Sequence, residues 1–135
     1  MINKDEIINK LKNIAKKYDL DFLIVFGSFL KESFREEGEL KSDIDIAYFK
    51  LKNDIKYDDL YFEIFETLNG RDIDLINLYD DNSYFLEKEI FEKGKKVYIK
   101  NKDLYFERYH QTFKNYNDWR QFDSILDRNL SKIEN

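Results

Sequence analysis

Two stretches decide the fold: Leu-Ile-Val-Phe-Gly-Ser at residues 23–28 and Ser-Asp-Ile-Asp-Ile-Ala at residues 42–47. The first is an apolar run that stops at Gly-Ser, and the second is an apolar run that two carboxylates interrupt. Because successive side chains of a β-strand point to opposite faces, Asp43 and Asp45 share one face and Ile44 and Ile46 share the other. Two acids on one face of a strand predict a site for a divalent metal ion.

The chemistry of these residues indicates which metal and which substrate to expect. Neighbouring carboxylates are costly, because like charges repel and burial removes their hydration. A cation relieves both costs, and hard oxygen ligands suit Mg²⁺, which completes its octahedron with water and substrate phosphates. Gly27 lets the backbone pass close to a ligand, and Ser28 offers a hydroxyl and an N–H at the expected start of a helix, where phosphate is attracted. We therefore expect Mg²⁺ as cofactor and a nucleoside triphosphate as substrate.

A third acid is available in Gly-Arg-Asp-Ile-Asp-Leu-Ile-Asn-Leu at residues 70–78. This run predicts another buried strand with Asp72 and Asp74 on one face, and two-metal phosphoryl transfer draws carboxylates from more than one strand. Asp74 is the better candidate, because it lies deeper in the apolar run. It would bind a second metal ion or act as general base for an attacking hydroxyl.

The rest of the chain alternates helix and strand, which predicts an α/β sandwich with a small mixed sheet flanked by helices. A capping-box pair, Asn3 and Glu6, begins the first helix, and Asn69-Gly70 ends a later one. The expected strands are 22–26, 43–49, 72–78 and 97–99, and the expected later helices begin near 28 and span 58–68 and 83–92. Residues 1–102 would form the catalytic domain, and residues 103–135 a helical extension that packs on the domain or on a partner.

The extension carries aromatic and aliphatic side chains at helical spacing, with a predicted break at residues 115–118 between two helices. An apolar helix face of this kind must be covered by other protein surface. Either the helices fold back on the sheet, or part of the aromatic face contacts a partner subunit. His110, which lies among these aromatics, is interpreted as structural or as a partner contact and not as a catalyst.

Composition limits the classes of function. The chain has 135 residues, 42% of them hydrophobic, which is enough for one domain with one core. The absence of cysteine excludes disulfides and cysteine-based zinc sites. A net charge of −5 argues against direct nucleic-acid binding. No signal-peptide pattern and no apolar run near the ~20 residues of a membrane span are found, so cytoplasm without membrane contact is the expectation.

Together these residues resemble the nucleotidyltransferase superfamily of the DNA polymerase β type, in which Gly-Ser, a spacer and Asp-x-Asp precede a third acid. The chain is most similar to the minimal nucleotidyltransferases (MNT), the antitoxins of HEPN/MNT toxin–antitoxin pairs. The resemblance implies that Gly27 and Ser28 bind the triphosphate, that Asp43 and Asp45 hold Mg²⁺, and that Asp74 is the third acid. Fourteen residues separate Ser28 from Asp43, slightly more than the spacer we expect in close relatives, and residues 36–41 predict a charged loop there.

The resemblance implies transfer of AMP from ATP to a hydroxyl, a tyrosine of a cognate HEPN ribonuclease toxin, within a hetero-oligomer. The alternative is a non-catalytic antitoxin that neutralises the toxin by binding and occlusion. An antibiotic nucleotidyltransferase is less favoured, because such enzymes usually carry a second domain that builds the acceptor pocket.

Overall fold

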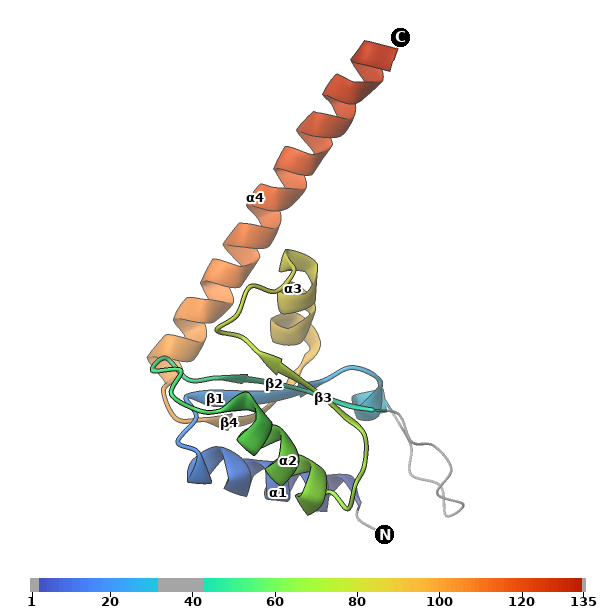
Figure 1. Cartoon of the computed structure of the whole chain (residues 1–135). Helices are drawn as coiled ribbons and strands as arrows, with labels where there is room; N and C mark the ends of the chain where they lie inside the picture. The colour runs from blue at the N-terminus through green and yellow to red at the C-terminus, as the bar shows by residue number, and fades with distance from the viewer. Residues whose placement is uncertain (1–2, 32–42, 135) are drawn as a thin grey trace.

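The computed structural model describes residues 3–31 and 43–134 (Figure 1). Helices and strands alternate along the described chain, as the sequence predicts. In chain order they are α1 (Lys4–Lys17), β1 (Phe22–Phe26), the 3-10 helix η1 (Ser28–Lys31), β2 (Ile44–Phe49), α2 (Tyr57–Thr67), β3 (Ile73–Asn77), α3 (Tyr84–Lys93), β4 (Lys95–Ile99) and α4 (Lys102–Glu134).

The described strands form one mixed sheet of four strands in the order β3-β2-β1-β4. Strand β1 is antiparallel to both of its neighbours, β2 and β4, and β2 is parallel to β3. The parallel pair is possible because α2 provides the crossover that two parallel strands need. The small mixed sheet flanked by helices confirms the predicted fold class.

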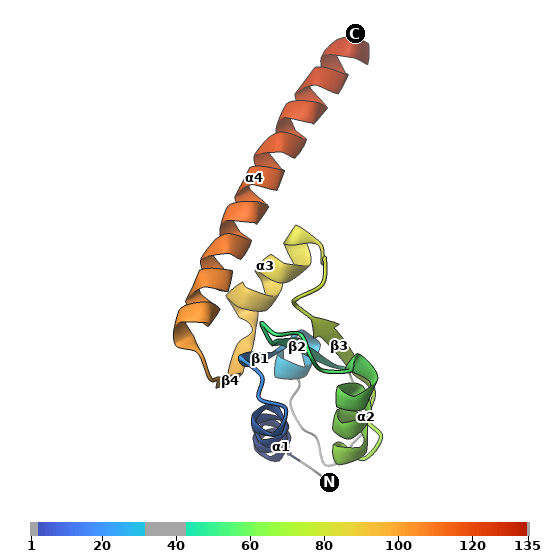
Figure 2. The ribbon, with the colours of Figure 1, turned by 60° about the vertical axis from the view of Figure 1, so that its left-hand side comes forward.

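Alternating side chains divide the core into two clusters, one on each face of the sheet. Ile44 and Ile46 pack with α1 and α2, whereas Ala47 and Phe49 pack with α3 and the start of α4. Figures 1 and 2 show the same arrangement, with α1 and α2 below the sheet and α3 and α4 above it. The odd-numbered positions of β2 therefore point to the α3 and α4 side.

Local sequence signals fix several helix ends. Asn3 caps α1 by accepting a hydrogen bond from the Glu6 N–H at 2.8 Å, as the capping pattern predicts. Helix α2 ends before Asn69 and Gly70, which have φ angles of 57° and 75°. Glycine tolerates this left-handed conformation best, so the predicted end of the helix is confirmed.

The predicted break at residues 115–118 is wrong, because α4 continues without interruption from Lys102 to Glu134. Asn and Asp often end helices by competing for backbone hydrogen bonds. Here their side chains bond to residues one helical turn earlier: Gln111 donates to Asn115 at 2.8 Å, and Lys114 pairs with Asp118 at 3.0 Å. The predicted C-terminal aromatic helices are therefore one helix.

The helix expected to begin near Ser28 begins as η1, a 3-10 turn. The charged loop expected at residues 36–41 lies outside the described residues. None of the described helices has the length and apolar character needed to cross a bilayer.

Candidate active site

The site begins at the turn after β1. Strand β1 is buried along its whole length, and Gly27 follows it directly and leads into η1. The φ of Gly27 is 81°, a left-handed conformation in which a residue with a Cβ is strained. Leu30 donates its N–H to the Gly27 carbonyl at 3.2 Å, which closes the turn. Gly27 and Ser28 are both exposed, so a ligand can approach their backbone.

Strand register brings Gly27 and two of the predicted aspartates to one end of the sheet. Phe26, the last residue of β1, is opposite Asp45 on β2. Asp45 is in turn aligned with Asp74 on β3. The sequence prediction of Asp74 in preference to Asp72 agrees with this register, because Asp72 precedes β3 and Asp74 lies within it.

The carboxylates lie on the α3 and α4 side of the sheet. Ile44 and Ile46 belong to the cluster under α1 and α2, so Asp45, which lies between them, points the other way. The same alternation applies to Asp74, which lies between Ile73 and Leu75. Asp43 immediately precedes β2 and is exposed, as is Asp74.

The Asp45 carboxylate packs directly over Gly27. A Cβ built on Gly27 would collide with the Asp45 Oδ2 atom, so only glycine leaves room for the carboxylate in this position. Partial burial raises the pKa of Asp45, and the nearby charges of Asp74 and Asp43 raise it further. Asp43 and Asp74 are therefore close enough to Asp45 for their charges to act on its carboxylate.

This donor set suits a hard divalent cation. Carboxylate oxygens are the ligands Mg²⁺ prefers, and a cation between these aspartates would offset the repulsion that raises the Asp45 pKa. Within residues 3–31 and 43–134, no three Asp, Glu, His or Cys side chains are gathered closely enough to ligate one ion. Asp43 and Asp74 are exposed, so their side chains can turn toward Asp45.

Sequence reasoning did not identify Tyr57, the first residue of α2. Its hydroxyl donates to the Leu75 carbonyl at 2.7 Å, next to Asp74 in β3. Partial burial raises the pKa of the Tyr57 hydroxyl, and the Asp74 charge contributes to the shift. The hydrogen bond joins α2 to the strand that carries Asp74. No local sequence signal reveals this contact, because 18 residues separate donor and acceptor.

Two cations flank the turn that follows Gly27. Lys4 from α1 and Arg71, two residues before β3, lie over the ring of the buried Phe29, at 5.5 and 5.1 Å from its centroid. Lys4 also donates to the Leu30 carbonyl at 3.2 Å. Both side chains place positive charge beside η1, and this charge could attract a phosphate group.

The polymerase beta nucleotidyltransferase family model matches residues 9–103. The chain belongs to this nucleotidyltransferase family. The matched segment spans β1 to β4 and contains Gly27, Ser28 and the three aspartates. No curated protein matches the chain.

Solved structures with the same fold come from toxin–antitoxin complexes. A chain of a toxin–antitoxin complex with AMP-PNP superposes with a TM-score of 0.69 at 20% identity, covering 91% of this chain and 98% of that one. A chain of a complex of tri-AMPylated Shewanella oneidensis HEPN toxin with MNT antitoxin superposes with a TM-score of 0.69 at 19% identity, covering 95% and 99%. A chain of an MntA-HepT complex gives 0.69 at 19% identity, covering 94% and 99%. Identities this low show a shared fold.

Proposed function

We propose that this chain is a Mg²⁺-dependent nucleotidyltransferase and antitoxin, which transfers AMP from ATP to a tyrosine hydroxyl of a cognate HEPN ribonuclease toxin. The observation that carries the proposal is the register that aligns Asp45 with Asp74 while Asp45 packs over Gly27. A phosphate-binding turn and carboxylates from two strands then lie at one end of one sheet, as nucleotidyl transfer requires.

Each residue has a distinct role in the proposed reaction. The exposed Gly27–Ser28 turn binds the triphosphate, and Asp43 and Asp45 hold Mg²⁺. Bound Mg²⁺ would supply charge stabilisation for the attacking and leaving oxygens. Asp74 ligates a second ion or accepts the proton of the attacking hydroxyl. The hydroxyl oxygen bonds to the α-phosphorus of ATP, the bond from that phosphorus to the bridging oxygen breaks, and pyrophosphate leaves.

The acceptor and the nucleotide are inferred from the structures that share this fold. One contains AMP-PNP, an ATP analogue, and another contains a HEPN toxin that carries AMP groups. Family membership supports nucleotidyl transfer in general. The choice of AMP and of a HEPN acceptor for this chain rests on that likeness.

Intact-mass spectrometry tests the proposal. A HEPN-domain protein, the proposed acceptor, is incubated with the chain, ATP and Mg²⁺, and we expect its mass to rise in steps of one AMP. Asp74→Asn should slow transfer by about 10²-fold or more, because a base or ligand at the attacking oxygen acts in the transition state. Asp72→Asn is the matched control, since Asp72 is also exposed and lies two residues earlier. Equal rates for the two variants would contradict the role of Asp74.

The second candidate function is an antitoxin that neutralises its partner by occlusion. The exposed apolar side chains on the distal part of α4 favour protein binding whether or not transfer occurs. Occlusion leaves the partner's mass unchanged and its ribonuclease activity recoverable after separation. Neutralisation by Asp43→Asn without any mass increase would support this candidate over the enzyme.

A further inference from the structure

One face of α4 is buried in its first half and exposed in its second. Tyr105, Thr112, Trp119 and Leu126 are seven residues apart, so two full helical turns place them on the same side. Tyr105 and Thr112 are 2% and 4% exposed, whereas Trp119 and Leu126 are each 42% exposed. The side of α4 that packs on the domain therefore continues beyond it without a cover.

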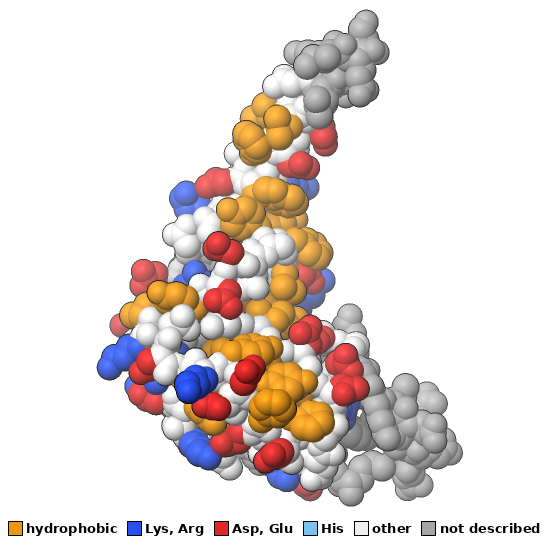
Figure 3. Space-filling view, viewed as in Figure 1, with side chains coloured by type: hydrophobic (Ala, Val, Ile, Leu, Met, Phe, Trp, Pro, Cys, Tyr) orange, Lys and Arg blue, Asp and Glu red, His pale blue; other side chains and the backbone are white. Residues whose placement is uncertain are grey.

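The exposure changes where α4 extends past α3. Lys88 of α3 lies over the Tyr116 ring at 5.0 Å, and Tyr116 contacts the Trp119 ring at 5.9 Å. The C-terminal part of α4 projects away from the rest of the domain, as both ribbon views show (Figures 1 and 2). Figure 3 shows hydrophobic side chains that run along α4 down to the body of the domain. We call Trp119, Phe122 and Leu126 the distal stripe; Phe122 is 60% exposed.

Acidic side chains border the distal stripe. At ~100° per residue, Asp123 lies about 40° and Asp127 about 80° round the helix from Trp119, with Arg120 beyond them at about 100°, so the part of this edge nearest the stripe is acidic. The described residues supply neither aspartate with an ion-pair partner. Asp118, on the other edge, pairs with Lys114. A complementary surface is therefore apolar in its centre and basic at the rim that meets Asp123 and Asp127.

A second copy of the chain matches this surface less well than a basic partner does. Antiparallel pairing of two such helices sets like edges against each other, so Asp123 and Asp127 would meet an edge that carries the same two aspartates, with Arg120 as its one cation. Parallel pairing would require the second helix to continue along the same side of α4, where Lys88 of α3 already covers Tyr116. We therefore take a different protein as the occupant.

We propose that the distal stripe is the docking surface for the acceptor protein, through a helical face with apolar side chains rimmed by Lys and Arg. The inference rests on the proposed function only in taking the docked protein as the acceptor. Tyr105 packs in the cluster on the face of the sheet to which Asp45 and Asp74 also point. A protein on the distal stripe is thus held on the side of the sheet that carries the acids, while the stripe itself takes no part in the chemistry.

Binding of the purified HEPN-domain protein that serves as the proposed acceptor tests the proposal. Titration calorimetry of the full chain should show Trp119→Ala with Phe122→Ala weakening binding by about 30-fold or more, the loss expected of aromatic anchors. Asp123→Lys with Asp127→Lys should weaken binding by about 10-fold at low salt and reduce its salt dependence. The control is Ser124→Ala with Arg128→Ala, since these residues lie about 140° and 180° round the helix from Trp119.

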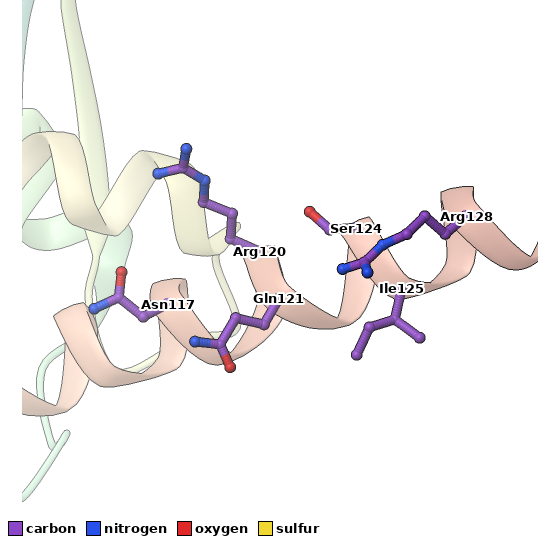
Figure 4. A pocket seen from close by; sticks show the side chains of 6 residues that line it. All are labelled: Asn117, Arg120, Gln121, Ser124, Ile125 and Arg128. Atoms are coloured by element: carbon purple, nitrogen blue, oxygen red, sulfur yellow. The ribbon is translucent and has the colours of Figure 1, made fainter.

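The control residues belong to a polar hollow on a different side of α4 (Figure 4). We expect the control variant to bind like the wild type, and every variant to keep its helical circular dichroism. Because the acids are untouched, the Trp119→Ala Phe122→Ala variant should still transfer AMP, and its loss should appear mainly as a higher partner concentration at half-maximal rate.

The possible outcomes separate the two proposals. A complex that depends on Trp119 but shows no mass increase supports the docking surface and contradicts the proposed AMP transfer. The docking proposal is overturned if the Trp119→Ala Phe122→Ala variant binds as well as the wild type. It is also overturned if the wild type does not bind the HEPN-domain protein. A wild-type dimer that this variant converts to monomer also overturns the docking proposal, because a second copy would then cover the stripe.

Discussion

Replacing Gly27 with alanine tests the arrangement of the site directly. The φ of 81° costs a residue with a Cβ about 1–2 kcal/mol. The new methyl group would also collide with the Asp45 carboxylate, and turning that side chain off its rotamer adds about 1 kcal/mol. A total loss of about 2–3 kcal/mol lowers the melting temperature by about 8–12 °C for a domain of this size. The displaced carboxylate should also lose its place as a metal ligand.

Gly70→Ala is the matched control. Gly70 has a φ of 75°, so the backbone cost is similar, but its Cβ would meet only the Phe65 ring at 3.6 Å, an ordinary contact. We expect its melting temperature to fall by about 4–8 °C. Excess ATP with Mg²⁺, at ~100 times the dissociation constant, should stabilise the wild type and Gly70→Ala by about 2.7 kcal/mol and leave Gly27→Ala unchanged. Equal nucleotide shifts in both variants would refute the placement of Asp45 over Gly27.

Two further predictions concern stability. Because the folded state raises the pKa of Asp45, the resulting stability is present below the ordinary aspartate pKa and is lost as pH rises through the raised value. Without nucleotide, Asp45→Asn should therefore melt above the wild type near pH 7 and lose that advantage near pH 4; an advantage independent of pH would contradict this. Tyr105→Ala should cost about 3–5 kcal/mol and Trp119→Ala less than about 1 kcal/mol in denaturant titrations, although both lie on one side of α4. Equal costs would show that Trp119 is covered within the chain.

The sequence predicted those parts of the site that depend on short-range pattern. Alternation along β2 placed Asp45 on the face opposite Ile44 and Ile46, and the same period placed Asp72 and Asp74 on one face, of which Asp74 was preferred because it lies deeper in the apolar run. Both follow from the geometry of a single strand. The need for carboxylates from two strands was inferred from the chemistry of phosphoryl transfer, whereas the parallel pairing that aligns Asp45 with Asp74 comes from the structure.

Long-range contacts could not be predicted from the sequence. The hydrogen bond from Tyr57 to the Leu75 carbonyl and the stacking of Lys4 and Arg71 on Phe29 join residues far apart in the chain. The continuity of α4 was missed for a different reason. Asn115 and Asp118 have low helix propensity, and the pairs they form one turn earlier decide the outcome.

The continuity of α4 has a mechanical consequence for the proposed reaction. A break at residues 115–118 would let the distal stripe adopt any orientation relative to the sheet. In an uninterrupted helix, the rotation of Trp119 about the axis is fixed by that of Tyr105, which is anchored by the rings of Phe22 and Phe91 at 5.3 and 5.7 Å. A partner bound to the stripe is therefore held in one orientation relative to Asp45 and Asp74. Since effective concentration at a reacting group depends on such orientation, a rigid α4 would favour transfer to one particular hydroxyl of the docked protein.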